Sequence, residues 1–452
     1  MSPLLELITD RGAHYPMHAR ITAYLDPPDI FNLSQTSKAH SNIYNDIKKT
    51  HWSVGARLNY FFTNVQAFRN VQAQSGALIG GRFALDFFKR RPISAHSTSQ
   101  MDLCVEVGAN TDMITEYLMA EGYKVRPDDD DAEHHIMFVK GSTTDDSSGP
   151  RICMHSKPMS PIITVLRHSL TTADMNFLSS HKAYCLFPIQ TLLEEAAYLM
   201  KPVRKMNEPS DILIRKKIRQ LLRTSYKVQE PDSGFHMTGK PEHKRALSGL
   251  RQAGDRYSWV MDLDTTNVQP PSRPEHILEF ATFGLWVTGL SPYDRPNSDK
   301  NFTQYYAAST TNVRSPVLKH TYAIDIGHHA IDIGHQHPKV KDLVKALNDR
   351  FYLQVALMEP EDRPEEFETF PPVRPRYEIE TIDGFTPPVF WNYCDDDVMS
   401  LLRAVRTKID DRHDNAVKVS KGLKSEDDLV NEMRDLFYRM MPEIGLPELR
   451  NI

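Results

Sequence analysis

The stretch that decides the fold is SGALIGGRFALDFFKRR, residues 75–91, followed after a polar segment by MDLCVE, residues 101–106. A short apolar run ends at Gly80-Gly81, and a helix-like segment follows directly. A glycine pair between a strand and a helix lets the backbone approach a phosphate, and free N–H groups at the helix N-terminus favour an anion. We therefore expect this turn to bind substrate. Its candidate residues are Ser75, Gly80, Gly81 and Arg82.

The next strand-like segment carries the candidate catalytic groups, Asp102, Cys104 and Glu106. Because side chains alternate along a strand, all three belong to one face. Either carboxylate could accept a proton from a substrate amine or pair with a guanidinium group. Cys104 could carry an acyl group, although a buried, inert thiol is the commoner fate of a cysteine.

This order of a Gly-Gly turn, a helix and a carboxylate-bearing strand resembles the nucleotidyltransferase fold. The resemblance implies an α+β protein with a nucleotidyltransferase-like mixed sheet with helices, a helical N-terminal cap and a mixed C-terminal region. In that fold an Asp-x-Asp pair and a third carboxylate on a neighbouring strand hold two Mg²⁺ ions. Here Asp102 matches the first position, Cys104 the second, and Cys153, in the segment 151–154, the third.

Thiols are poor ligands for Mg²⁺, which prefers oxygen atoms. We therefore expect no metal ion, no cofactor and no transfer of nucleotide from a nucleoside triphosphate. An active nucleotidyltransferase with a displaced set of ligands remains the alternative. The histidine-rich repeat AIDIGHHAIDIGHQ, residues 323–336, could bind Zn²⁺, but its spacing fits no known metal motif.

Residues 160–192 and 254–265 resemble a large group of uncharacterised fungal proteins built on this core. Some fungal proteins of this kind are arginine-containing cyclodipeptide synthases, which join aminoacyl groups from two charged tRNAs into a diketopiperazine. The resemblance implies a transferase that uses aminoacyl-tRNA, with the nucleotide cleft holding the aminoacyl end.

Residues 201–227 form the most basic window of the chain. Helical spacing aligns Arg215, Arg219 and Arg223 in one stripe, with an apolar side opposite. Such a helix can pack by its apolar side and present cations to RNA phosphates, or can simply be a solvated amphipathic helix. The candidate RNA-binding residues are Arg215, Lys216, Arg219 and Arg223.

The segment YLDPPDIFNLSQTSK, residues 24–38, resembles an F-box, a helical module that binds the Skp1 adaptor of ubiquitin ligases. Asp26-Pro27-Pro28 would end one helix, and Asp29 could cap the next. Two interpretations stay open. The segment binds Skp1 as a non-catalytic substrate adaptor, or it is a helical cap that packs on the core without a partner.

Composition sets the remaining limits. The chain has 452 residues, a net charge of −5 and four scattered cysteines without a CxxC pair. The cysteine usage indicates a reducing, cytoplasmic setting, and no apolar run is long enough to span a membrane. The net charge does not favour nucleic acid, so RNA would have to bind at a local basic patch. We expect three domains: 1–70, an F-box-like cap; 71–227, the core with the basic helix; and 228–452, an α/β C-terminal region.

Three helices are expected in the last domain. They span residues 272–287, with Pro274 near the start, residues 395–412 and residues 425–440.

Overall fold

The computed structural model describes residues 15–36, 43–91, 100–126, 135–141, 149–201, 209–224, 226–229, 231, 246–288, 305–325, 338–364, 387–389 and 391–419. The chain divides into two compact units. The first comprises residues 1–237, 258–273 and 291–305, and the second comprises the rest. The three-domain division with boundaries after residues 70 and 227 stays a prediction.

The first unit is built on an eight-stranded mixed sheet with the order β11-β7-β6-β1-β2-β5-β4-β3. Only the β2–β5 pair is parallel among the pairings of this sheet that the structure describes. The strands are β1 (Leu78–Gly80), β2 (Gln100–Glu106), β3 (Lys124–Val125), β4 (His135–Val139), β5 (Arg151–Lys157), β6 (Asn176–Leu178), β7 (Lys182–Cys185) and β11 (Trp259–Asp262). The predicted α+β class with a mixed sheet and helices is confirmed.

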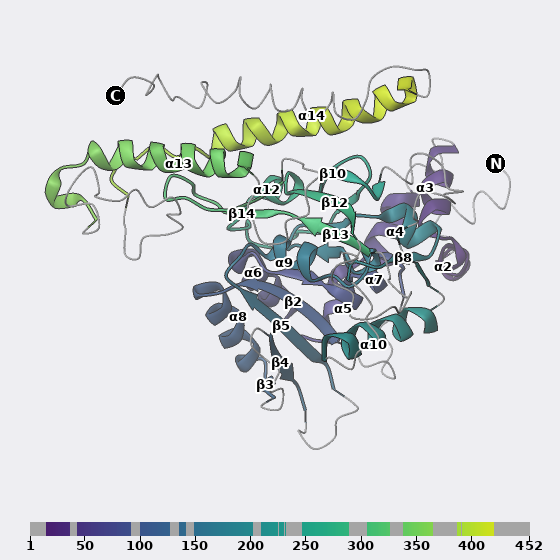
Figure 1. Ribbon diagram of the computed structural model, residues 1–452. Helices are drawn as coiled ribbons and strands as arrows, with labels where there is room; N and C mark the ends of the chain where they lie inside the picture. The colour runs from purple at the N-terminus through teal and green to yellow at the C-terminus, as the bar shows by residue number, and fades with distance from the viewer. Residues whose placement is uncertain are drawn as a thin grey trace, which may run out of the picture. The chain divides into compact units, whose positions relative to one another are not determined.

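Helices surround this sheet (Figure 1). They are α2 (Tyr15–Tyr24), α3 (Pro27–Thr36), α4 (Ile43–Thr50), α5 (Val54–Leu58), α6 (Val65–Ser75), α7 (Gly81–Phe88), α8 (Ala109–Ala120), α9 (Pro161–His168) and α10 (Pro209–Arg223), with short turns η1 (Thr172–Asp174) and η2 (Ile189–Leu193). Two small parallel strands, β8 (Ala196–Tyr198) and β9 (Lys227–Gln229), pair beside them.

The deciding stretch folds as expected. Gly76 ends α6 in the left-handed region at φ 64°, where a residue without Cβ is favoured. The fully buried β1 then runs into Gly80 and Gly81, where α7 begins. β2 pairs with β1 so that Gly80 lies opposite Asp102. Leu103 and Val105 of β2 enter the buried core with Ile114 and Leu118 of α8, which leaves Asp102, Cys104 and Glu106 on the opposite face.

The N-terminal helices share the core of the sheet. Ile30 of α3 and Ile47 of α4 are fully buried in the same cluster as Leu103. Trp52 packs edge-on against Trp259 of β11, with ring centroids 5.3 Å apart, and its Nε1 donates to the carbonyl of Phe88 at 3.3 Å. The N-terminal helices therefore pack on the core of the sheet, as a helical cap would. Binding to Skp1 stays a prediction.

The second unit contains the sheet β10-β12-β13 and the hairpin β14-β15. Its elements are β10 (Gly249–Gln252), α12 (Glu275–Glu279), β12 (Thr282–Thr288), β13 (Tyr305–Ser309), β14 (Thr311–Val313), β15 (Tyr322–Ile324), α13 (Pro338–Ala356), η4 (Pro360–Asp362) and α14 (Asp395–Val419). The helix expected over residues 395–412 is confirmed by α14. His328, His329 and His335 of the repeat lie outside the described residues, as does the helix expected over residues 425–440.

The helix expected over residues 272–287 is wrong. Only α12 is helical there, and the residues after Ala281 form β12, which pairs antiparallel with β10. Gly284 of this strand packs closely against two residues that are distant in sequence. A Cβ there would meet Ser309 Oγ at 2.7 Å and Asp325 Oδ2 at 2.8 Å. The strand therefore depends on partners that are distant in sequence, which local periodicity does not report.

Replacing Trp52 by alanine should lower the free energy of unfolding of the first unit by about 3–5 kcal/mol, because it removes a buried indole and leaves a cavity. Tyr24→Ala is the control, since Tyr24 is 89% exposed and its loss should change stability by less than about 0.5 kcal/mol. Denaturant titration followed by fluorescence measures both. Equal midpoints for the two variants would contradict the shared core.

Candidate functional site

One face of the paired strands β2 and β5 carries the polar groups of the site. Parallel pairing sets Asp102 beside Cys153, Cys104 beside His155, and Glu106 beside Lys157. Because β5 also alternates, Cys153, His155 and Lys157 belong to one face. The structure thus brings Cys153 next to Asp102, as the resemblance implied, and adds His155, which the sequence analysis did not select.

Gly81 fixes the position of Asp102. Its φ of 62° is in the left-handed region, and a Cβ at this position would overlap Asp102 Oδ2. The carboxylate therefore packs directly against the backbone of the first turn of α7, and only glycine satisfies both the dihedral angle and the close approach. The Gly-Gly turn serves to seat the Asp102 side chain.

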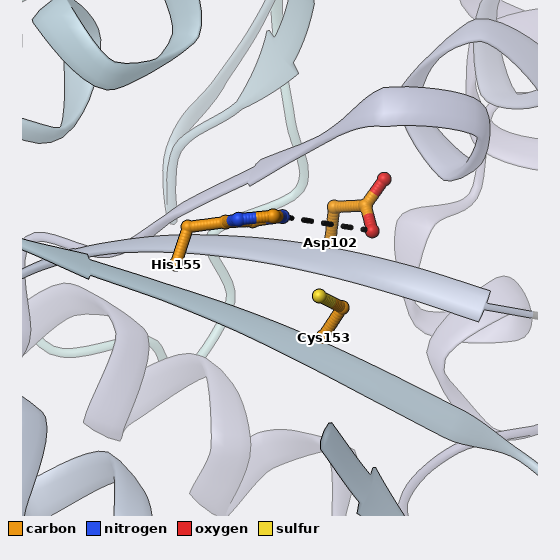
Figure 2. Close-up of side chains that lie close together, drawn as sticks. All are labelled: Asp102, Cys153 and His155. Atoms are coloured by element: carbon orange, nitrogen blue, oxygen red, sulfur yellow. Dashed lines mark ion pairs between the residues drawn. The ribbon is translucent and has the colours of Figure 1, made fainter. Parts of the chain in front are cut away.

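Asp102, Cys153 and His155 form a compact group (Figure 2), with their potential ligand atoms all within 4.8 Å of one another. His155 Nε2 lies 3.9 Å from Asp102 Oδ1, and Gln100 Nε2 donates to the same oxygen at 2.6 Å. Burial alone would raise the pKa of Asp102. The neighbouring His155 outweighs burial, and Gln100 and Lys217 add to its effect, so this pKa lies below its usual value. Burial lowers the pKa of His155, yet the nearby Asp102 carboxylate and Cys153 thiol outweigh it and raise this pKa to about 10.

A second cation, the half-buried Lys217 of α10, reaches this region. Its Nζ lies 2.7 Å from Asp174 Oδ1, and its charge also acts on Asp102. Burial would lower the pKa of Lys217, but the neighbouring Asp174 and Asp102 carboxylates raise it overall. The carboxylates Asp102 and Asp174 are therefore balanced by the cations His155 and Lys217.

The other two candidate catalytic residues are engaged or buried. Glu106 Oε2 accepts a hydrogen bond from Arg273 at 2.8 Å, and the same guanidinium donates to Ser160 Oγ at 2.9 Å. Cys104 is 6% exposed, and burial first, then the charge of Asp102, raises the pKa of its thiol. A thiol held neutral in this way is a poor acyl carrier.

The donor set does not fit a two-magnesium centre, because two of its expected carboxylates are thiols, Cys104 and Cys153. A thiolate, an imidazole and a carboxylate suit Zn²⁺ better, and Asp102, Cys153 and His155 are close enough to share such an ion. The proton on His155 and the charge of Lys217 oppose a divalent cation at this point. With Asp102 and Asp174 balanced by these two cations, the group lacks the excess of negative charge that holds a divalent cation.

The candidate substrate-binding residues have structural contacts. Ser75 is buried, donates to the carbonyl of Gln72 at 3.4 Å, and accepts from the N–H of Ala77 at 3.4 Å. Arg82 Nε donates to Asp86 Oδ2 at 3.0 Å, one helical turn along α7. Substrate binding by Ser75, Gly80, Gly81 and Arg82 stays a prediction.

The basic helix has two faces. Lys216, Arg219 and Arg223 are exposed, and Arg215 is half-buried with contacts of its own. Leu221, one turn after Lys217, is buried against Leu85, Ala173, Ala197 and Tyr226. RNA binding by Arg215, Lys216, Arg219 and Arg223 stays a prediction.

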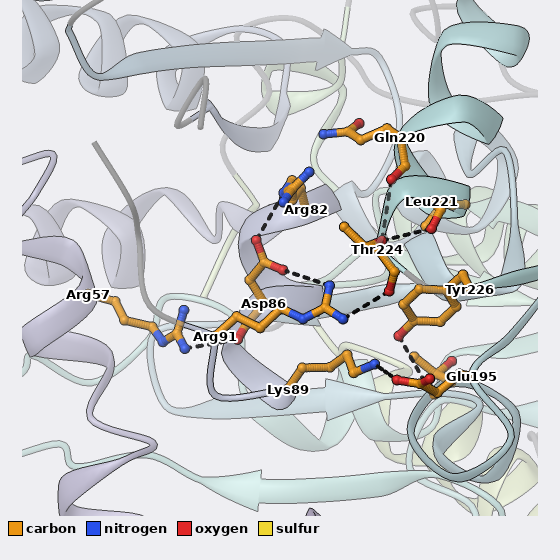
Figure 3. Close-up of polar contacts among 11 residues, drawn as sticks. Arg57, Arg82, Asp86, Lys89, Arg91, Glu195, Gln220, Leu221, Thr224 and Tyr226 are labelled. Atoms are coloured by element: carbon orange, nitrogen blue, oxygen red, sulfur yellow. Dashed lines mark hydrogen bonds and ion pairs between the residues drawn. The ribbon is translucent and has the colours of Figure 1, made fainter. Parts of the chain in front are cut away.

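Polar contacts tie the end of α10 to α7 and the segment after it (Figure 3). Arg91 NH2 donates to the carbonyl of Thr224 at 3.1 Å, and Asp86 lies between Arg82 and Arg91. Lys89 pairs with Glu195 and lies 4.6 Å above the ring of Tyr226. The Gly-Gly turn and the basic helix are thereby linked.

Sequence reasoning missed three residues here. His155 follows Cys153 by two positions, so strand alternation could have found it. Lys217 precedes the apolar Leu221 by four positions, which indicates the inward side of a helix. Arg273 is 167 residues from Glu106, and no local signal points to it.

Comparisons with known proteins add little. No protein-family model and no curated protein matches the chain. One solved structure, a CCA-adding enzyme in complex with CTP, has a TM-score of 0.27 and 13% identity over 39% of this chain. The match spans 42% of that enzyme, less than half its length. Among the described residues, no helix is both long and apolar enough to cross a membrane.

Gly81→Ala should displace Asp102 and lower the free energy of unfolding by more than about 1–2 kcal/mol, the cost of a left-handed alanine alone. Gly55→Ala is the matched control. It lies in helix α5 with no atom within 4 Å of a new Cβ, so alanine should be neutral or stabilise by about 0.5–1 kcal/mol. Thermal unfolding and a crystal structure of the first variant test this. An Asp102 side chain that stays in place would refute the proposed packing.

The Asp102–His155 pair should make stability depend on pH. Because the folded-state pKa of His155, about 10, exceeds its usual 6.5, its stabilising contribution is fully present below pH 6.5 and is lost as the pH rises through 10. The difference in thermal midpoint between wild type and His155→Gln should therefore shrink between pH 6.5 and pH 10. A difference that stays constant over this range would rule out the ion pair.

Proposed function

We propose that this chain is a metal-independent transferase that uses aminoacyl-tRNA, and that its reaction is the synthesis of an arginine-containing cyclodipeptide. One observation carries the proposal. The face where the resemblance implies a metal-binding carboxylate cluster has one central carboxylate, Asp102, set among the cations His155 and Lys217. Fixed side-chain cations can stabilise negative charge without a metal ion.

The chemistry of an aminoacyl ester suits such a site, because the ester is already activated. The amine of one aminoacyl group attacks the ester carbonyl of the other, so a C–N bond forms and the C–O bond to the ribose breaks. The proton lost by the amine is finally taken up by the leaving ribose oxygen. The free amine of the resulting dipeptidyl ester then attacks the remaining ester carbonyl in the same way, which forms the second C–N bond, closes the ring and releases the second ribose hydroxyl. Cations near the carbonyl would stabilise the oxyanion that forms in between.

Asp102 is the group we assign to the substrate amine or guanidinium. Its low pKa keeps it ionised, which favours charge pairing over removal of a proton. Glu106 is a weaker candidate because it already pairs with Arg273. Cys104 is weaker as well, since its buried thiol has a raised pKa.

The exposed side of α10 would meet the RNA. Its cations Lys216, Arg219 and Arg223 are accessible, while Lys217 and Leu221 hold the helix from the other side. The bonds between Arg91 and Thr224 would keep this surface in place while the aminoacyl end lies near Asp102.

A second function, a Skp1-binding adaptor, is favoured by exposed apolar groups on α2. Tyr24 and Met17 are 89% and 53% exposed, as a partner-binding surface requires. Tight co-purification with Skp1 that Tyr24→Asp abolishes would favour this function. Transfer of labelled nucleotide into RNA, abolished by a chelator, would instead favour an active nucleotidyltransferase.

Replacing Lys216, Arg219 and Arg223 together by glutamine should weaken the binding of charged tRNA. The slope of log K against log salt concentration should become less negative by about two to three, because each lost phosphate contact changes this slope by about 0.9. The control replaces three exposed cations outside α10, Lys49, Lys124 and Arg126, and should leave the slope unchanged. Fluorescence titrations from low to high salt measure both. Equal slopes for the two triple variants would remove α10 from the interface.

Asp102→Asn should leave tRNA binding intact and reduce product formation by about 10²–10³-fold, since it removes a charge at the reacting end and no phosphate contact. Mass spectrometry of reactions with charged tRNAs measures the cyclic dipeptide. Formation of no cyclic dipeptide by the wild-type protein with any charged tRNA would overturn the proposed reaction.

A further inference from the structure

A second group of basic side chains lies beyond the Asp102 cluster. Lys157 is the last residue of β5, Arg167 and His168 occupy the last turn of α9, and Lys201 follows the bridge at Leu199. Arg167 and His168 are exposed, and Lys157 and Lys201 are half-buried. The proposed reaction has so far used none of them.

Backbone geometry brings these residues together. Lys157 shares its strand face with His155, and its carbonyl accepts from the N–H of Val107 at 3.0 Å. The N–H of Met200 donates to the carbonyl of Leu170 at 2.9 Å, and Thr171 forms an antiparallel bridge with Leu199. Lys201 is thereby held beside the end of α9.

The charges in this group act on one another. His168 is exposed but partly covered, and this partial burial, followed by the charges of Lys157, Lys201, His155 and Arg167, lowers the pKa of His168. Burial, and then Arg167, also lowers the pKa of Lys201. Within the described part of the chain, Lys201 has no ion pair with a carboxylate. Gathering like charges costs folding free energy, which a bound anion would offset.

We propose that His168 and Lys201, with Lys157 and Arg167, bind a phosphate group of the RNA next to the Asp102 cluster. This rests on the proposed function and deepens it. Lys157 lies two positions after His155 on the same strand face, so a phosphate held here would lie on the side of the sheet that carries Asp102. Several donors that converge from a strand, a helix end and a loop suit the oxygens of a phosphate.

The test uses the full chain and three probes: inorganic pyrophosphate, ATP, and a fluorescent hexaribonucleotide ending in CCA. The test variant combines Lys201→Gln with His168→Gln. The control combines Lys49→Gln with Lys124→Gln, two exposed lysines on other elements. Thermal unfolding first verifies that both variants are folded. We expect about tenfold weaker pyrophosphate and hexanucleotide binding for the test variant, and a change of less than about twofold for the control.

The outcomes separate this site from the proposed function. Equal affinities in wild type and test variant, or equal losses in test variant and control, would overturn the phosphate site. Loss of pyrophosphate and ATP binding in the test variant, without hexanucleotide binding by wild type, would overturn the RNA assignment and identify a nucleotide as the source of the phosphate. Weakened hexanucleotide binding together with an absence of cyclic dipeptide would support the RNA site and refute only the reaction.

Discussion

The contact between Asp102 and the backbone at Gly81 is the constraint on which the site depends. A carboxylate can lie against the first turn of a helix only where no Cβ intervenes, and Gly81 provides this at a φ of 62°. The pairing of Gly80 with Asp102 then fixes β1 and β2 in one register. His155 and Lys217 are placed by other elements, but both act on the carboxylate that this contact has positioned.

The balance of charge around Asp102 separates this site from one that binds two divalent cations. Two metal ions need several anionic oxygens, and here the second carboxylate of the face, Glu106, is paired with Arg273. His155 and Lys217 supply positive charge from fixed positions. Each carboxylate in this region thus has a cation near it: His155 near Asp102, Lys217 beside Asp174, and Arg273 beside Glu106.

Local patterns were sufficient to predict the β1–α7–β2 order and the shared face of Asp102, Cys104 and Glu106, because each follows from periodicity within one or two elements. The position of Cys153 beside Asp102 came from the resemblance to the nucleotidyltransferase fold. Local patterns failed for β12, whose strand state depends on pairing with β10. They also failed for Arg273, which reaches Glu106 only through the tertiary fold. The site residues that lie on one strand were therefore predictable, whereas the contact with Arg273, which comes from a distant segment, was not.

The two sides of α10 connect these observations. Its inward side is fixed by Lys217 to Asp174 and by Leu221 to the core, and its end is held by Arg91 through the carbonyl of Thr224. A helix fastened at both places cannot rotate without breaking a buried ion pair, a change that is strongly destabilising. The exposed cations of α10 therefore keep a fixed distance from Asp102. A helix that only shielded the core would need its apolar side alone. The half-buried Lys217 pairs with Asp174 and also acts on Asp102, so it links the charged surface of α10 to both carboxylates.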